Sequence, residues 1–159
     1  MLKGVFSASM QAVNFVNAPV IAKNKGIEVV TTKSETTGDY IGSISVSVTT
    51  DKDCATVSGA LIAKDIKRIV KMNDYNLSIA PEEHVLVVPH DNKPSMIAKV
   101  ATVIGENGIN INNMTVAPNE KNDLSMMIIS TGSAVDKNSI EKINKIDGVK
   151  KAKYVHLNK

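Results

Sequence analysis

The stretch HVLVVPHDNKPSMIAKVATVIGENGININNMTVA, residues 84–117, decides the fold of this chain of 159 residues. It opens with the apolar run 85–88, which has the length of a strand and stops at the turn-forming residues 89–94. A helix should begin there, because Pro94 suits a first helical turn and Asn92 lies close enough to cap the amides that follow.

The predicted helix is amphipathic. Its apolar side chains recur at helical spacing and form one stripe, made of Met96, Ile97, Val100, Val103 and Ile104. Gly108 ends the helix, and residues 109–116 predict a second strand. This unit of strand, turn, helix and strand places three polar residues at its two junctions, namely His90, Asn92 and Asn110.

The rest of the second half repeats the pattern. Residues 118–123 form a polar hairpin loop and residues 124–130 a third strand, and a second helix over 136–146 stops at Gly148 before a fourth strand over 149–157. The order βαββαβ predicts a four-stranded sheet with two helices on one face. We expect the other face to be an oligomer surface.

The first half predicts a small, mainly antiparallel sheet with one or two helices. Residues 1–25 look helical, and the strand-like segments are 27–32, 40–50, 54–62, 68–72 and 75–80. Ile44, Val46 and Val48 alternate with serines, which is the period of a strand with one buried and one wet face.

The break at Ala80-Pro81-Glu82-Glu83 marks a boundary between domains, because the pattern starts afresh after it. The fold class is therefore α+β. We expect a partial domain at residues 1–81, which is small and mainly antiparallel, and a βαββαβ ferredoxin-like domain at residues 82–159.

Composition excludes several classes of function. The net charge of +3 and 3% aromatic residues do not favour nucleic-acid binding. Cys54 is the only cysteine, so no internal disulfide is possible and no Cys/His spacing suggests a metal site. No run of about 20 apolar residues and no signal pattern occurs, so we expect a cytoplasmic protein without a membrane partner. No Gly-rich dinucleotide loop occurs, which argues against hydride transfer.

A free amino acid is a plausible ligand for the polar junctions. The amides after Pro94 suit its carboxylate, Asn92 and Asn110 offer carbonyl oxygens, and His90 offers a tunable nitrogen, provided that the fold brings residue 110 beside residue 92. The simpler interpretation makes Asn92 a cap, Asn110 a turn residue and His90 a solvated loop residue. Both interpretations remain open from the pattern alone.

No residue is placed as a catalyst, because no Ser, Cys or carboxylate is positioned by sequence to form a nucleophile and base pair with His90. His84 and His156 fall in strand-like segments and receive no role. A basic cluster in the first half could hold an anionic metabolite, although a solvated strand face explains it as well: Lys64, Lys67, Arg68 and Lys71.

Two motifs resemble a known family. The segments from His90 to Pro94 and from Gly108 to Ile111 are similar to the ACT domain of D-3-phosphoglycerate dehydrogenases. Residues 13–19, VNFVNAP, with Ala22-Lys23, Gly26-Ile27 and Arg68-Ile69-Val70, resemble the intervening domain of the long-form enzymes. The resemblance covers nearly the whole chain.

The resemblance implies a regulatory site. In the family, two ACT domains pair edge to edge and bind L-serine at their interface, and the binding residues correspond here to His90, Asn92 and Asn110. Pro94 and Ser95 stand at the entrance of the helix, where the family usually has Arg-Pro-Gly and this chain has Lys93-Pro94-Ser95. Ser95 adds a Cβ and a hydroxyl, which either narrow the pocket or contribute a hydrogen bond.

The resemblance also implies what the chain lacks. The catalytic and NAD-binding domains of the family would precede residue 1, so we expect a regulatory fragment without a cofactor, a metal or dehydrogenase activity of its own. A homodimer through the ACT domains is the expected assembly. The alternatives are a purely structural oligomerisation module with an empty pocket and the regulatory chain of an L-serine dehydratase.

Overall fold

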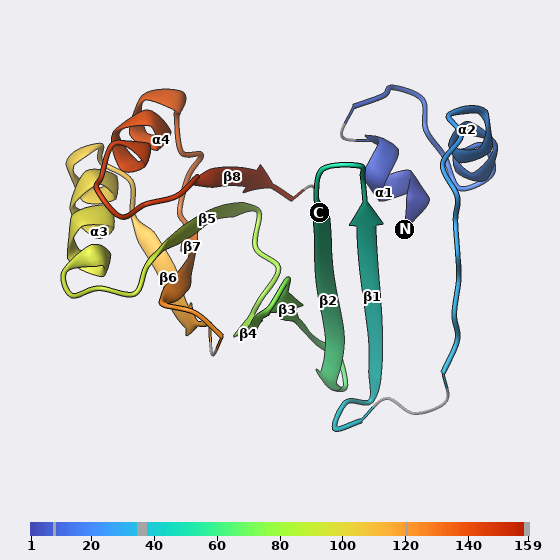
Figure 1. The fold of residues 1–159 in the computed structure, drawn as a ribbon, viewed down its shortest axis with the longest axis horizontal. Coiled ribbons are helices and arrows are strands. Elements are labelled where there is room, and N and C mark those ends of the chain that lie inside the picture. Colours follow the sequence, from blue (N-terminus) through green and yellow to red (C-terminus); the bar gives the residue numbers. More distant parts are fainter. Residues whose placement is uncertain (8, 35–37, 120, 158–159) are drawn as a thin grey trace. The chain divides into compact units, whose positions relative to one another are not determined.

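The computed structural model describes residues 1–7, 9–34, 38–119 and 121–157 (Figure 1). The chain divides into two compact units, Met1–Gly38 and Asp39–Lys159. The predicted domain boundary between residues 81 and 82 lies inside the second unit and stays a prediction. No helix among the described residues is both long and apolar enough to cross a membrane.

The first unit contains two short helices, α1 (Leu2–Ser7) and α2 (Ala18–Asn24). They enclose a small apolar cluster of Phe6, Ala18 and Ala22. The helical prediction for residues 1–25 is confirmed at these two helices. The strand prediction for residues 27–32 is wrong, since this segment forms no strand and Val30 is 79% exposed. β-branched residues favour a strand only where a neighbouring strand can pair with them.

The second unit begins with an antiparallel sheet in the order β1-β2-β3-β4, with the predicted strands confirmed. Its strands are β1 (Gly42–Thr49), β2 (Cys54–Ala63), β3 (Ile66–Met72) and β4 (Tyr75–Ile79). The prediction that one face of the first strand is buried is wrong, because Ile44 is 52% and Val48 is 46% exposed within this unit. β1 is an edge strand, and the buried residues of this sheet lie on β2 and β4.

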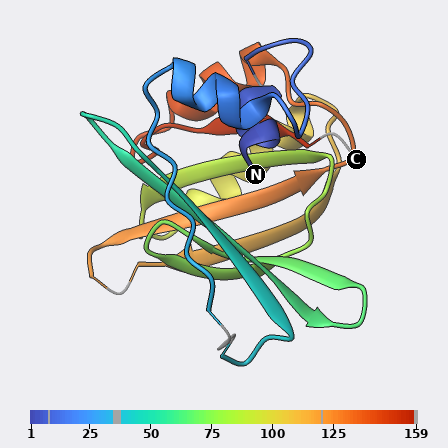
Figure 2. The ribbon, with the colours of Figure 1, turned by 90° about the vertical axis from the view of Figure 1, so that its right-hand side faces the viewer.

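The second sheet has the predicted βαββαβ order and confirms the α+β fold class. Its strands pair antiparallel in the order β6-β7-β5-β8 and lie side by side in Figure 2. The elements are β5 (His84–Asp91), α3 (Met96–Glu106), β6 (Ile111–Pro118), β7 (Leu124–Thr131), α4 (Lys137–Asn144) and β8 (Lys153–His156). Gly108 and Gly148 have φ angles of +71° and +93° after the two helices, as expected of glycines that end helices.

The helices α3 and α4 cover one face of this sheet (Figure 1). Alternate strand residues meet the apolar faces of the helices in one core, whose fully buried members include Leu86, Val88, Val100, Ile104, Met127, Ile129 and Ile143. Full burial of such a side chain contributes about 1.5–3 kcal/mol, so this core fixes the register of the strands that carry the polar junctions.

The opposite face of the second sheet is covered by the first sheet. Tyr75 and Ile79 of β4 pack in one cluster with Val85, Val87 and Met126. The expectation that this face is an open oligomer surface is therefore wrong. Its alternating apolar residues need a cover, and the β3–β4 hairpin of the same chain provides one.

Candidate functional site

The candidate site lies where β5 ends and the chain turns toward α3. The prediction that the strand stops at Pro89 is wrong, because β5 continues through Pro89 to Asp91. Regular pairing of β5 with β8 ends at Val87, and beyond it the carbonyl of Pro89 accepts a hydrogen bond of 2.9 Å from the amide of Lys150. A proline fits there, since regular pairing on that side has stopped.

The helix α3 begins without a side-chain cap. Its first residue is Met96 rather than Pro94, and Ser95 precedes it with a φ of +67°. Asn92 does not cap the helix, so the capping prediction is wrong. The first amides of α3 therefore remain available to a negatively charged group, which the positive end of the helix dipole favours.

His90 is a buried strand residue, which corrects the interpretation of a solvated loop histidine. It is 2% exposed, and its Nδ1 lies 2.7 Å from the carbonyl oxygen of Asp91. A carbonyl only accepts, so Nδ1 carries the proton and Nε2 presents a lone pair. Nε2 has no partner among the described residues, and neither does the buried hydroxyl of Ser125, directly opposite on β7.

Two lysines neutralise the carboxylate beside the site. Lys150 and Lys93 lie 2.5 Å and 3.0 Å from the oxygens of Asp91. The hydrogen bond from Lys150, followed by that from Lys93, lowers the pKa of Asp91 below its ordinary value. The hydrogen bond between Lys93 and Asp91 also raises the pKa of Lys93. An anionic ligand therefore meets little repulsion from Asp91, while the carboxylate is engaged and is a poor partner for an ammonium group.

Asn92 stands at the rim of an open hollow of about 410 Å³. Its backbone amide donates to the carbonyl of Asp123 at 2.8 Å, which fixes the main chain, whereas its side-chain amide makes no hydrogen bond among the described residues. Pro94 and Ser95 are exposed in the adjoining turn. The hollow is lined by Asp91, Asn92, Lys93, Asp123 and Leu124.

Asn110 lies at the other end of the same sheet. Residue 111 pairs with Thr131 at the end of β7, whereas Asp91 pairs with Leu124 at its start. Seven residues of strand separate these positions along β7, or roughly 23 Å. The expectation that the fold brings residue 110 beside residue 92 is therefore wrong within one chain. Asn110 instead donates from Nδ2 to Oδ1 of Asn112 at 3.2 Å.

Sequence reasoning missed two features of this domain. Lys150 reaches Asp91 from the loop after α4, which only the tertiary fold shows. Glu83, His84 and His156 come together at the far end of β5, because β5 and β8 are neighbours in the sheet. The only signal in the sequence was a pair of histidines in two separate strand-like segments.

Family comparisons divide the chain in the same order as the resemblance. Residues 1–73 match the model of the D-3-phosphoglycerate dehydrogenase intervening domain, and residues 84–148 match the ACT domain. The turn between β5 and α3 and residue Asn110 both fall within the residues matched to the ACT domain.

Similar proteins from three organisms support the same family assignment. D-3-phosphoglycerate dehydrogenase of Methanocaldococcus jannaschii is 34% identical over 98% of this chain, that of Synechocystis is 28% identical over 98%, and that of Bacillus subtilis is 30% identical over 91%. The chain spans only 30%, 28% and 28% of these relatives. The chain therefore consists of a phosphoglycerate dehydrogenase intervening domain and an ACT domain, and it corresponds to the regulatory portion of the D-3-phosphoglycerate dehydrogenases.

Proposed function

We propose that this chain is a feedback-regulatory module that binds L-serine through its ACT domain. The observation that supports this most directly is that one short segment carries the buried, unpartnered Nε2 of His90, the unpaired side-chain amide of Asn92 and the uncapped start of α3. Buried polar atoms are normally hydrogen-bonded, so an unsatisfied nitrogen on the strand that leads to free helix amides suits a polar ligand.

Each group of the ligand has a matching partner. The carboxylate would accept hydrogen bonds from the first amides of α3, and the ammonium group would donate to the side-chain oxygen of Asn92. The serine hydroxyl would donate to Nε2 of His90, which carries a lone pair. Pro94 and Ser95 shape the entrance, and the hydroxyl of Ser95 offers one further hydrogen bond.

The site would be completed by Asn110 from a second copy. Since β6 is an edge strand, two copies can join their β6 edges antiparallel across a two-fold axis. That arrangement brings the start of the second copy's β6, which Asn110 precedes, toward the Pro118 end of β6 in the first copy. Pro118 and His90 both pair with Ser125, so this is the end that carries His90 and Asn92. Joining the β8 edges would instead leave the second copy's β6, and Asn110 with it, two strand spacings farther from β5, about 10 Å.

In the complete enzyme, this binding would control the serine pathway. Serine would favour one arrangement of the domains and lower the dehydrogenase activity of the NAD-dependent catalytic part, with a coupling of about 1–3 kcal/mol. The chain by itself would supply neither NAD nor catalytic groups. A cytoplasmic location fits this role and stays a prediction.

Calorimetric titration with L-serine tests the ligand. We expect heat of binding with L-serine and at least tenfold weaker binding with D-serine and glycine, since only the correct stereoisomer places the hydroxyl against His90. Asn92→Ala and Asn110→Ala should each abolish the heat, whereas Asn138→Ala, an exposed residue in the first turn of α4, should not. No heat at millimolar L-serine rejects the proposal, and a dimer indifferent to serine would favour a structural module.

A mixing experiment tests the shared site. Asn92→Ala and Asn110→Ala chains bind nothing alone, but their mixed dimer holds one site with both substitutions and one with neither. Random exchange should restore about one quarter of the sites. If both asparagines acted within one chain, mixing would restore none.

A further inference from the structure

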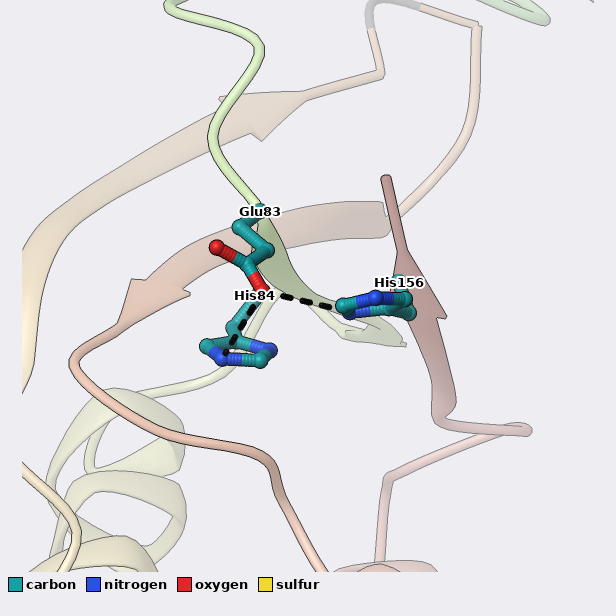
Figure 3. A group of neighbouring side chains, drawn as sticks. All are labelled: Glu83, His84 and His156. Atoms are coloured by element: carbon teal, nitrogen blue, oxygen red, sulfur yellow. Dashed lines mark ion pairs between the residues drawn. The ribbon is translucent and has the colours of Figure 1, made fainter. Parts of the chain in front are cut away.

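A cluster of three possible metal ligands lies at the far end of the second sheet. His84 begins β5 and is the register partner of His156 on β8, so their side chains share one face of the sheet. The amide of Leu157 donates to the carbonyl of Glu83 at 2.8 Å and extends this pairing by one residue. Figure 3 shows the Glu83 carboxylate joined by dashed lines to both imidazole rings.

The three ligand atoms lie close to one another. One carboxylate oxygen of Glu83 lies 3.9 Å from Nε2 of His84 and 4.0 Å from Nδ1 of His156, and all three ligand atoms lie within 4.8 Å of one another. Zinc bonds of about 2.0–2.2 Å place tetrahedral ligand atoms roughly 3.3–3.6 Å apart. Small rotations suffice to close the difference, since the side chains of Glu83 and His156 are about half exposed.

A neighbouring tyrosine positions His84 for this role. Nδ1 of His84 lies 2.6 Å from the hydroxyl oxygen of Tyr154, and the two rings stack with their centroids 6.1 Å apart. When Nδ1 donates its proton to that oxygen, the lone pair is on Nε2, the atom that faces Glu83. Metal-binding histidines commonly have such a partner on the other nitrogen, because it fixes the ring and its tautomer.

We propose that Glu83, His84 and His156 bind a divalent transition-metal ion, with Zn²⁺ as the representative ion. Two imidazoles and one carboxylate suit zinc and its first-row neighbours, whereas Mg²⁺ and Ca²⁺ prefer oxygen ligands throughout. Three protein ligands leave a coordination position for water. It is the only such group of three within the described part of the chain, and it is separate from the proposed serine site.

The bound ion would link the short edge strand β8 to the inner strand β5. β8 has four residues, lies at the edge of the sheet and pairs with β5 alone. Because Glu83 directly precedes β5, His84 begins it and His156 ends β8, the ion would hold the two strands in register. A ligand that binds only the folded state raises stability, so zinc should raise the midpoint of thermal unfolding.

Titration of the metal-free chain with Co²⁺ tests the proposal, followed by displacement with Zn²⁺. We expect one Co²⁺ per chain, visible d–d absorption and its loss on adding zinc. Glu83→Gln, His84→Gln and His156→Gln should each weaken zinc binding at least tenfold. Glu82→Gln is the matched control next to the site, and Cys54→Ser tests the exposed thiol as a competing ligand. Both controls should bind like the unaltered chain.

Thermal unfolding separates a lost ligand from a damaged fold. His156→Gln alters an exposed side chain and should melt with the unaltered chain in the presence of a chelator, but it should gain nothing from zinc. The proposal fails if millimolar Co²⁺ produces no d–d absorption, if the Cys54→Ser chain loses the ion, or if His156→Gln binds zinc as tightly as the unaltered chain.

Discussion

At the scale of single residues, Ser95 carries a strained backbone. Its φ of +67° lies in the left-handed region, which costs an L-residue about 1 kcal/mol relative to glycine. Ser95→Gly should therefore raise the free energy of unfolding by about 0.5–1 kcal/mol in urea. Ser78→Gly is the control, since this exposed residue of β4 has no positive φ and should lose a similar amount. A loss of stability in Ser95→Gly would contradict the assigned strain.

The lysines around Asp91 predict a dependence of stability on pH. The pKa of Asp91 is lowered by Lys150 and then Lys93, so the folded state binds this proton less readily than the unfolded chain. The stabilisation is present above the ordinary carboxyl pKa and is lost as the pH falls through the lower folded value. Asp91→Asn and Lys150→Met should both flatten the loss of stability in acid, measured by urea unfolding at a series of pH values. Unchanged acid profiles would show that the ion pair is not coupled to folding.

At the scale of elements, periodicity predicted most of this fold. Apolar stripes identified α3 and α4, and Gly108 and Gly148 marked their ends, because these signals are local. The segment 27–32 was predicted as a strand from β-branched residues, but a strand also needs a partner. The start of α3 moved to Met96, since Ser95 turns the chain in a conformation that serine rarely adopts.

The candidate site was predictable only in part. His90 and Asn92 are close in sequence, so the pattern gathered them on one turn. The distance from Asn92 to Asn110 depends on the strand order and directions: β5 and β6 both run antiparallel to β7, so the end of β5 and the start of β6 lie at opposite ends of the sheet. The pairing of His84 with His156 likewise follows from strand order, which no local pattern encodes.

Substituting alanine for each of two glycines in this domain should change the free energy of unfolding in opposite directions. Gly105 lies inside α3 with open space around its Cβ position, so Gly105→Ala should add about 0.5–1 kcal/mol by favouring the helix. Gly148 has a φ of +93°, and a Cβ there would lie 3.3 Å from the Met96 side chain, so Gly148→Ala should cost about 1–3 kcal/mol. Urea unfolding of the pair checks both signs, and equal effects would refute the assigned roles.

At the scale of the whole molecule, covering both faces of the second sheet changes where a partner can bind. The helices take one face and the β3–β4 hairpin the other, so the free backbone groups of this sheet lie on its two edges, β6 and β8. Exposed edges are natural sites for strand pairing between chains. A dimer of this domain should therefore join sheets edge to edge and cover little apolar surface.

Each edge strand carries one exposed valine, and substituting the two valines in turn can show which edge forms the dimer interface. Val116 on β6 is 36% exposed and Val155 on β8 is 39% exposed. If the β6 edges join, Val116→Lys brings like charges together in the dimer and should raise its dissociation constant at least tenfold, about 1.4 kcal/mol. Serine binding should weaken in parallel, because each site then loses Asn110 of the other copy. Val155→Lys should leave both properties unchanged. Sedimentation velocity over a range of concentrations measures the dissociation constant, and dissociation caused by Val155→Lys alone would assign the interface to β8 and reject the shared serine site.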